Sequence, residues 1–100
     1  MIVFFDLPVT EKPAQKAAAK FRNFLVKDGY LMIQFSVYSR VCNGYDAVKT
    51  HEKRLKQHLP PNGSVRLLTI TEKQYESMQI LLGEYVQSDI PVAYEQLTLL

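Results

Sequence analysis

One acidic residue at the end of an apolar segment is well suited to metal chemistry. Asp6 follows the β-prone run 1–5 and is itself followed by Leu7-Pro8. A carboxylate is a hard oxygen ligand, and Mg²⁺ is often held by one or two carboxylates together with waters and substrate phosphates. Such a metal can activate water or stabilise a leaving oxygen in phosphodiester cleavage. One Asp per chain is an incomplete site that a two-fold dimer would complete. The alternative is a turn residue that accepts local backbone hydrogen bonds before Pro8.

A second candidate is a stripe of lysines on a predicted helix. Lys12, Lys16, Lys20 and Lys27 recur at spacings that place them on one side of a helix over 11–27, nearly opposite its apolar residues. A basic stripe binds DNA phosphates without reading sequence, and such binding weakens steeply with salt. The alternative is an ordinary solvated helix face. Arg22, Arg40, Arg54 and Arg66 are further basic candidates, which the sequence does not place on one surface.

Four other reactive side chains have simpler structural interpretations. Ser36 has no visible base beside it and is interpreted as a strand residue. His51 and His58 are seven residues apart, too far for the i, i+4 pairing of a helical metal site, and are expected at the surface or a helix edge. Cys42 is the only cysteine, which excludes an internal disulfide and favours a reducing compartment.

The apolar periodicity predicts the elements that position these residues. The helix over 11–27 buries its Ala and Phe residues, with Thr10 as N-cap and Gly29 as the left-handed residue after its end. The second helix, over 46–58, is assigned Asp46 as N-cap. Strands are predicted at 1–5, in one or two pieces over 30–42, and at 65–71. Residues 72–77 are expected to form one helical turn, and 78–82 either a strand or a continued helix.

This order predicts an α+β, ferredoxin-like (split βαβ) fold with extra C-terminal β segments. The first strand is expected in the middle of the sheet, buried on both faces. Two helices cover only one face of a sheet, so the other face is expected to pair in a homodimer through the sheets. Residues 1–100 are expected to form one domain, with 78–100 as a tail that adds strands to its own or a partner's sheet.

Composition sets the remaining bounds. The chain has 100 residues, of which 47% are hydrophobic and 22% charged, as in an ordinary globular domain. The apolar runs are too short for a membrane helix, and the start lacks the features of a signal peptide. We therefore expect a cytoplasmic protein with no membrane partner. The formal net charge of +2 means that any nucleic-acid contact depends on how the charges are arranged.

Several motifs in order resemble one known family. They are the apolar strand ending in Asp6, the Phe-Arg-Asn-Phe-Leu helix, Gln34-Phe35-Ser36-Val37-Tyr38, and the strand within 63–71 followed by Thr-Glu-Lys-Gln. Together they resemble the CRISPR-associated Cas2 family, the small dimeric subunit of the spacer-acquisition machinery. The amino-acid sequences of these motifs are most similar to those of members from systems with a single large effector nuclease.

The resemblance implies a ferredoxin-like homodimer clamped by two dimers of the adaptation integrase, with double-stranded protospacer DNA as the bound nucleic acid. It also implies, for many members, a metal-dependent nuclease in which Asp6 would be the catalytic and metal-binding residue, holding Mg²⁺ at the dimer axis. The apolar tail residues Leu97, Leu99 and Leu100 would dock on the integrase by strand addition.

Three departures from the family pattern bear on catalysis. Phe5 replaces a Tyr, Pro13 and Gln15 occupy the region of an early Arg, and Met32 replaces another Arg. Because they reduce the positive charge expected near Asp6, they favour a non-catalytic scaffold that bridges integrases over a Mg²⁺-dependent endonuclease acting on RNA or DNA. A third hypothesis is an unrelated toxin-like ribonuclease or a small regulatory dimer, since this fold hosts many functions.

Overall fold

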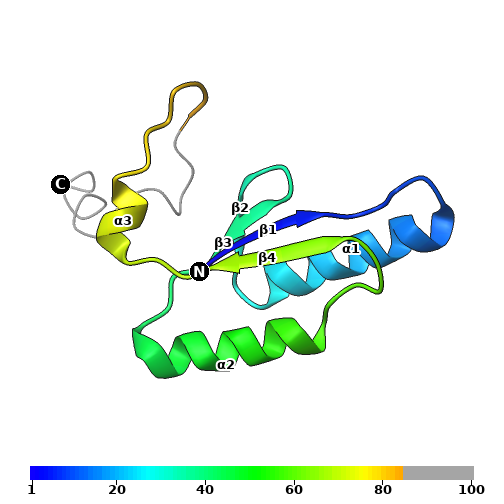
Figure 1. The fold of residues 1–100 in the computed structure, drawn as a ribbon, viewed down its shortest axis with the longest axis horizontal. Coiled ribbons are helices and arrows are strands. Elements are labelled where there is room, and N and C mark those ends of the chain that lie inside the picture. Colours follow the sequence, from blue (N-terminus) through cyan, green and yellow to red (C-terminus); the bar gives the residue numbers. More distant parts are fainter. Residues whose placement is uncertain (85–100) are drawn as a thin grey trace.

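The computed structural model describes residues 1–84, and its sheet has the predicted topology. In chain order the elements are β1 (Ile2–Asp6), α1 (Lys12–Lys27), β2 (Leu31–Gln34), β3 (Val37–Ser39), α2 (Gly44–Gln57), β4 (Ser64–Leu68) and α3 (Glu72–Glu76). The strands form one antiparallel sheet in the order β2-β3-β1-β4, and α1 and α2 lie on the same side of it (Figure 1). The fold is therefore α+β and ferredoxin-like, as the sequence predicts.

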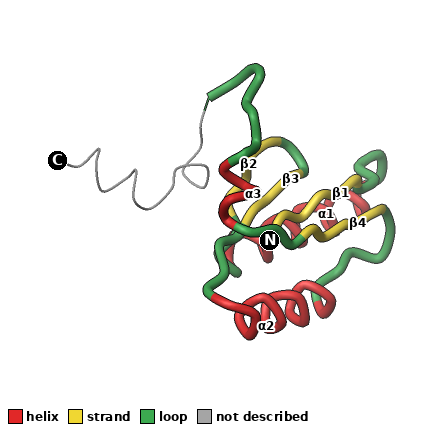
Figure 2. The backbone as a smooth tube through the Cα atoms, turned by 60° about the vertical axis from the view of Figure 1, so that its left-hand side comes forward, coloured by secondary structure: helices red, strands yellow, loops and turns green. Residues whose placement is uncertain are grey.

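β1 lies in the middle of the sheet, but it is buried on one face only. Val3 and Phe5 are buried among the helices, whereas Phe4 is 37% exposed and Asp6 is exposed. The prediction of burial on both faces is wrong for a single chain, because α1 and α2 cover only one side. Ile2 lies on the same face as Phe4 and is nevertheless 3% exposed. Ile2 pairs with Leu68 at the end of β4, and Figure 2 shows the chain continuing from there into α3.

The core forms where α1 and α2 meet the sheet. Phe21 and Leu25 of α1 and Leu55 of α2 pack with the inward residues of β1 and β3. The Phe5 ring meets Phe21 edge-on at 5.3 Å between centroids and stacks on Tyr38 at 5.6 Å. Aromatic pairs with these geometries add to the stabilisation that burial gives.

The helix ends differ from the prediction at their starts. The N-cap position of α1 is Glu11 and not Thr10, and the Glu11 side chain forms no capping hydrogen bond. α2 begins at Gly44 after Asn43, so Asp46 lies in the first turn and is not the N-cap. Its charge still favours the helix, because the N-terminus carries the positive end of the helix dipole. Gly29 has φ +92°, which confirms the predicted left-handed residue after α1.

The segment after β4 contains the predicted helical turn and no further regular element among the residues described. α3 is fixed by a capping box in which Thr71 and Gln74 exchange two hydrogen bonds of 2.8 and 3.2 Å. Residues 78–82 form neither a strand nor a continued helix, so that prediction is wrong. Leu97, Leu99 and Leu100 lie outside the described residues. Within 1–84, no helix is long and apolar enough to cross a membrane.

Candidate functional site

Asp6 ends β1 at a point where two loops hold the backbone. On one side it pairs with Ser64 of β4, directly after the turn at Gly63. Gly63 has φ +101°, and a Cβ there would lie 2.6 Å from the Asp6 carbonyl oxygen. Real Cβ atoms essentially never come that close to backbone. Glycine is therefore required for the α2–β4 loop to lie against the end of β1.

On the other side, the β2–β3 turn holds the residue before Asp6. The backbone N–H of Phe5 donates to the carbonyl of Ser36 at 3.0 Å. Ser36 has φ +63° and lies in the turn, because β3 begins at Val37. The interpretation of Ser36 as a strand residue is thus wrong. Its position indicates a structural role in holding the turn beside β1.

The Asp6 carboxylate is exposed, and among residues 1–84 no metal-ligating cluster surrounds it. Over residues 1–84, no group of three or more His, Cys, Asp or Glu side chains could hold a metal ion. A lone hard carboxylate fits as one ligand of Mg²⁺ together with waters and phosphates. A second carboxylate would have to come from another copy of the chain. The metal role of Asp6 stays a prediction.

Arg66 is the basic residue that the structure brings into the same region. β4 places it opposite Phe4, and its exposed side chain leaves the same face of the sheet as Asp6. The alternation of Val65, Arg66 and Leu67 signals that Arg66 faces away from the core. The position of Arg66 relative to Asp6 depends on the β1–β4 register, which the sequence does not define.

The lysine stripe is present as predicted in position and exposure. Lys12, Lys16, Lys20 and Lys27 are all exposed on α1. They span about 22 Å along the axis at 1.5 Å per residue. Within the described chain, none of the ion pairs involves them. Their charges are therefore available to a polyanion.

The positive charge is concentrated on the helical side of the molecule. Nine of the twelve basic residues lie on α1 or α2, whereas the only acidic residues on these helices are Asp46 and Glu52. The small net charge conceals this asymmetry. A surface of this kind attracts phosphate backbones although the whole chain is close to neutral.

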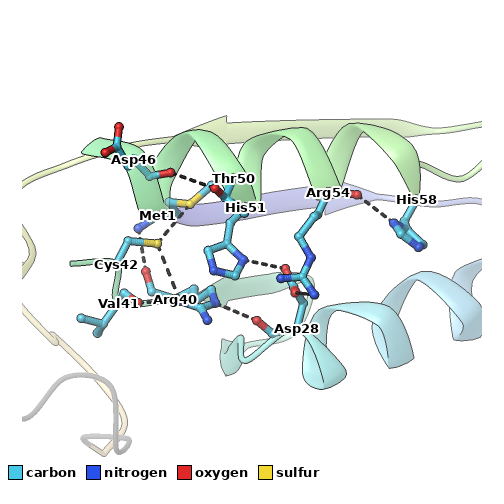
Figure 3. A network of polar contacts seen from close by, with 10 residues as sticks. All are labelled: Met1, Asp28, Arg40, Val41, Cys42, Asp46, Thr50, His51, Arg54 and His58. Atoms are coloured by element: carbon cyan, nitrogen blue, oxygen red, sulfur yellow. Dashed lines mark hydrogen bonds and ion pairs between the residues drawn. The ribbon is translucent and has the colours of Figure 1, made fainter. Parts of the chain in front are cut away.

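A buried polar network joins the end of α1 to α2 (Figure 3). The Asp28 side chain is 3% exposed. Its Oδ2 lies 2.9 Å from Nδ1 of His51, and its Oδ1 lies 3.1 Å from Nη2 of Arg54. Arg40 Nε donates to the Asp28 carbonyl at 2.7 Å. Because a buried charge needs such partners, this network is structural, and it commits Arg40 and Arg54 to the fold.

The two histidines differ from one another. His51 is buried at 8% exposure, so its predicted place at the surface or a helix edge is wrong. His58 is exposed, stacks on the Phe24 ring at 4.0 Å between centroids, and has Nδ1 2.8 Å from the Arg54 carbonyl. No sequence motif signals the His51–Asp28 contact, which forms only when α2 packs beside the end of α1.

Tyr30 and Cys42 are two reactive groups held by the fold. Burial, followed by the nearby Asp28 charge, raises the pKa of Tyr30 to about 12. Its hydroxyl is buried and has no hydrogen-bond partner among the described residues. Cys42 is half-buried, with Sγ 3.5 Å from the Met1 sulfur and 3.8 Å from Nη1 of Arg40. Neither group adjoins the exposed end of β1.

These features define a small ferredoxin-like α+β protein with a basic helical layer and an exposed strand-end carboxylate. The family model for CRISPR associated protein Cas2 matches residues 1–78. This chain belongs to that family.

Named relatives support the same assignment. A CRISPR-associated endoribonuclease Cas2 of Acidovorax ebreus is 58% identical over 83 residues, which are 83% of this chain and 81% of the relative. Its counterpart in Campylobacter jejuni is 50% identical over 86 residues, covering 86% of this chain and 60% of that protein. A third, from Ligilactobacillus salivarius, is 42% identical over 87 residues, which are 87% of this chain and 86% of the relative.

Proposed function

We propose that this chain is a dimeric scaffold for CRISPR spacer acquisition. It bridges dimers of the adaptation integrase and binds double-stranded protospacer DNA through its helical layer. Membership of the Cas2 family supports the CRISPR-associated role. The observation that carries DNA binding is the set of four exposed lysines, free of ion pairs within 1–84, on a helical layer with nine basic residues. Family membership argues against the unrelated toxin-like or regulatory class.

The homodimer part of the proposal depends on the exposed face of the sheet. Phe4, Leu31 and Leu68 are 37%, 45% and 48% exposed on this side. Apolar side chains gathered on one sheet face are stabilised when a second surface removes them from water. A second copy of the chain provides a matching surface, because a two-fold interface uses the same patch twice.

Integrase docking is assigned to the C-terminal tail. The apolar residues Leu97, Leu99 and Leu100 are proposed to add a strand to a sheet edge of the integrase. A chain that ends before Glu95 should then still bind duplex DNA but fail to assemble with the integrase. Normal assembly and integration by this truncated chain would contradict the assignment.

DNA binding is tested by replacing Lys12, Lys16, Lys20 and Lys27 together with Gln. The neutral variant keeps the helix-forming tendency of the exposed positions. We expect the reconstituted complex of variant and integrase to assemble, yet to bind a protospacer duplex much more weakly than the wild type. Equal affinity at low salt would place the DNA on another surface.

A second candidate function is a metal-dependent endonuclease. Its support is the exposed Asp6 at the end of β1 and the printed name of the relatives, which are called endoribonucleases. Asp6 would be one ligand of Mg²⁺, and the metal would supply water activation. Cleavage of RNA or DNA that requires Mg²⁺ and is lost in Asp6→Asn, with the fold intact, would support this function. Activity that persists in Asp6→Asn would indicate a contaminating nuclease.

A further inference from the structure

The exposed sheet face carries an acid and a base close together at the end of β1. β1 and β4 pair Phe4 with Arg66 and Asp6 with Ser64. Directly opposed residues of an antiparallel pair project from the same face. Asp6 and Arg66 are therefore diagonal neighbours, which are typically about 7–8 Å apart, with their Cβ atoms somewhat closer.

Neither charge is neutralised inside the subunit. Both side chains are exposed, and over residues 1–84 no ion pair includes either of them. They flank Phe4, whose ring is 37% exposed. One carboxylate and one guanidinium beside an exposed aromatic ring make this patch self-complementary in charge and in apolar surface.

We propose that Asp6 of each subunit pairs with Arg66 of the partner subunit when two sheets pack face to face. This inference rests on the proposed homodimer and deepens it by naming the contact that sets its register. In an isologous interface each contact occurs twice, so one acid and one base per chain give two ion pairs. A register that placed Asp6 against Asp6 and Arg66 against Arg66 would bring like charges together, which is costly at an interface.

The pairing gives Asp6 a role that requires no metal. In a metal-centred dimer, two Asp6 carboxylates approach one cation, and removal of the cation leaves two facing negative charges. In the pairing proposed here, each carboxylate faces a guanidinium, and the dimer is independent of divalent cations. Chelation therefore separates the two arrangements.

A charge swap tests the pairing on the full-length chain. Analytical ultracentrifugation would measure the dimer Kd at low salt in EDTA for the wild type, Asp6→Arg, Arg66→Asp and the double variant. We expect each single variant to raise Kd by about tenfold or more, because like charges then face each other. The double variant should return to within about threefold of the wild type, as expected for directly coupled residues. Lys53→Asp, an exposed charge reversal on α2, is the matched control and should leave Kd unchanged.

Each other outcome has a definite meaning. A double variant as weak as the single variants overturns the pairing and leaves the homodimer standing. A wild-type chain that stays monomeric overturns both, and a wild-type dimer that EDTA dissociates overturns the pairing in favour of a bridging metal. If a charge reversal unfolds the chain, the neutral variants Asp6→Asn and Arg66→Gln decide through their double-mutant cycle: coupling of the two substitutions supports the pairing, and simple additivity overturns it.

Discussion

Gly63 lies against the backbone of Asp6, so closely that a Cβ at Gly63 would be 2.6 Å from the Asp6 carbonyl oxygen. The same atom would be 2.8 Å from Cδ2 of Leu7. The exposed carboxylate at the end of β1 is thus positioned by a glycine in the loop between α2 and β4. Any function of Asp6 depends on this contact.

Gly63→Ala should destabilise the chain by about 1–3 kcal/mol, because it adds strain at positive φ to a clash with backbone. Urea unfolding measures the difference. Gly44→Ala is the matched control, since Gly44 also has positive φ (+86°) but no atom within 4 Å of its added Cβ. A cost for Gly63→Ala no larger than that for Gly44→Ala would contradict the close approach.

Lysines of the α1 stripe should contribute individually to the salt dependence of DNA binding. Each contact with a phosphate adds about 0.9 to the magnitude of the slope of log K against log salt. Lys20→Gln should lower that magnitude by about this amount, with little dependence on duplex sequence. Lys73→Gln, on α3 and outside the helical layer, should leave the slope unchanged. Equal effects of both substitutions would show that the stripe has no special role.

Removal of the Asp28 carboxylate should destabilise the fold, because the buried hydrogen bond to His51 is lost together with the ion pair to Arg54. Asp28→Ala is expected to cost about 1.5–3 kcal/mol, the range for hydrogen bonds to charged groups. Thermal unfolding measures it. Asp46→Ala removes an exposed carboxylate near a helix N-terminus and should cost less than about 1 kcal/mol. Equal costs would mean that the network contributes nothing beyond an ordinary surface acid.

Stability should decline in alkali because of Tyr30. The pKa of Tyr30 is raised from 10.0 to about 12 in the folded chain, so the folded state holds the phenolic proton more tightly than the unfolded state. This contribution is fully present below about pH 10 and is lost as the pH rises toward 12.

Tyr30→Phe removes that contribution and should flatten the decline in the free energy of unfolding between about pH 10 and 12. At pH 7 the substitution should cost little, because the buried hydroxyl has no hydrogen-bond partner within residues 1–84. Unfolding of both chains at each pH provides the comparison. An unchanged pH dependence in the Phe variant would assign the alkaline loss to other groups.

Periodicity and composition were sufficient to predict the fold class. The apolar spacing of α1 identifies Phe21 and Leu25 as buried, and the β-prone runs locate the strands. The burial of β1 on both faces was a wrong prediction, because two helices cover only one side of the sheet. The helix starts differed by one or two residues, since no side-chain hydrogen bond marks either N-cap.

The relations between distant residues could not be read from the sequence. Arg66 joins Asp6 on one face only through the register of β1 with β4. His51 becomes buried only when Asp28, at the end of another helix, reaches it. Pairwise contacts of this kind depend on tertiary packing, for which local spacing carries no signal.

The most direct test of the scaffold proposal is an integration assay reconstituted with the cognate integrase, wild type against Asp6→Asn, at concentrations that keep both chains dimeric. The substitution removes the negative charge at the end of β1 but keeps a side chain of the same size there. If the chain acts as a scaffold, the variant assembles and integrates protospacer DNA at a rate close to that of the wild type. An assembled complex whose integration collapses would contradict the scaffold and place Asp6 and its metal in the reaction.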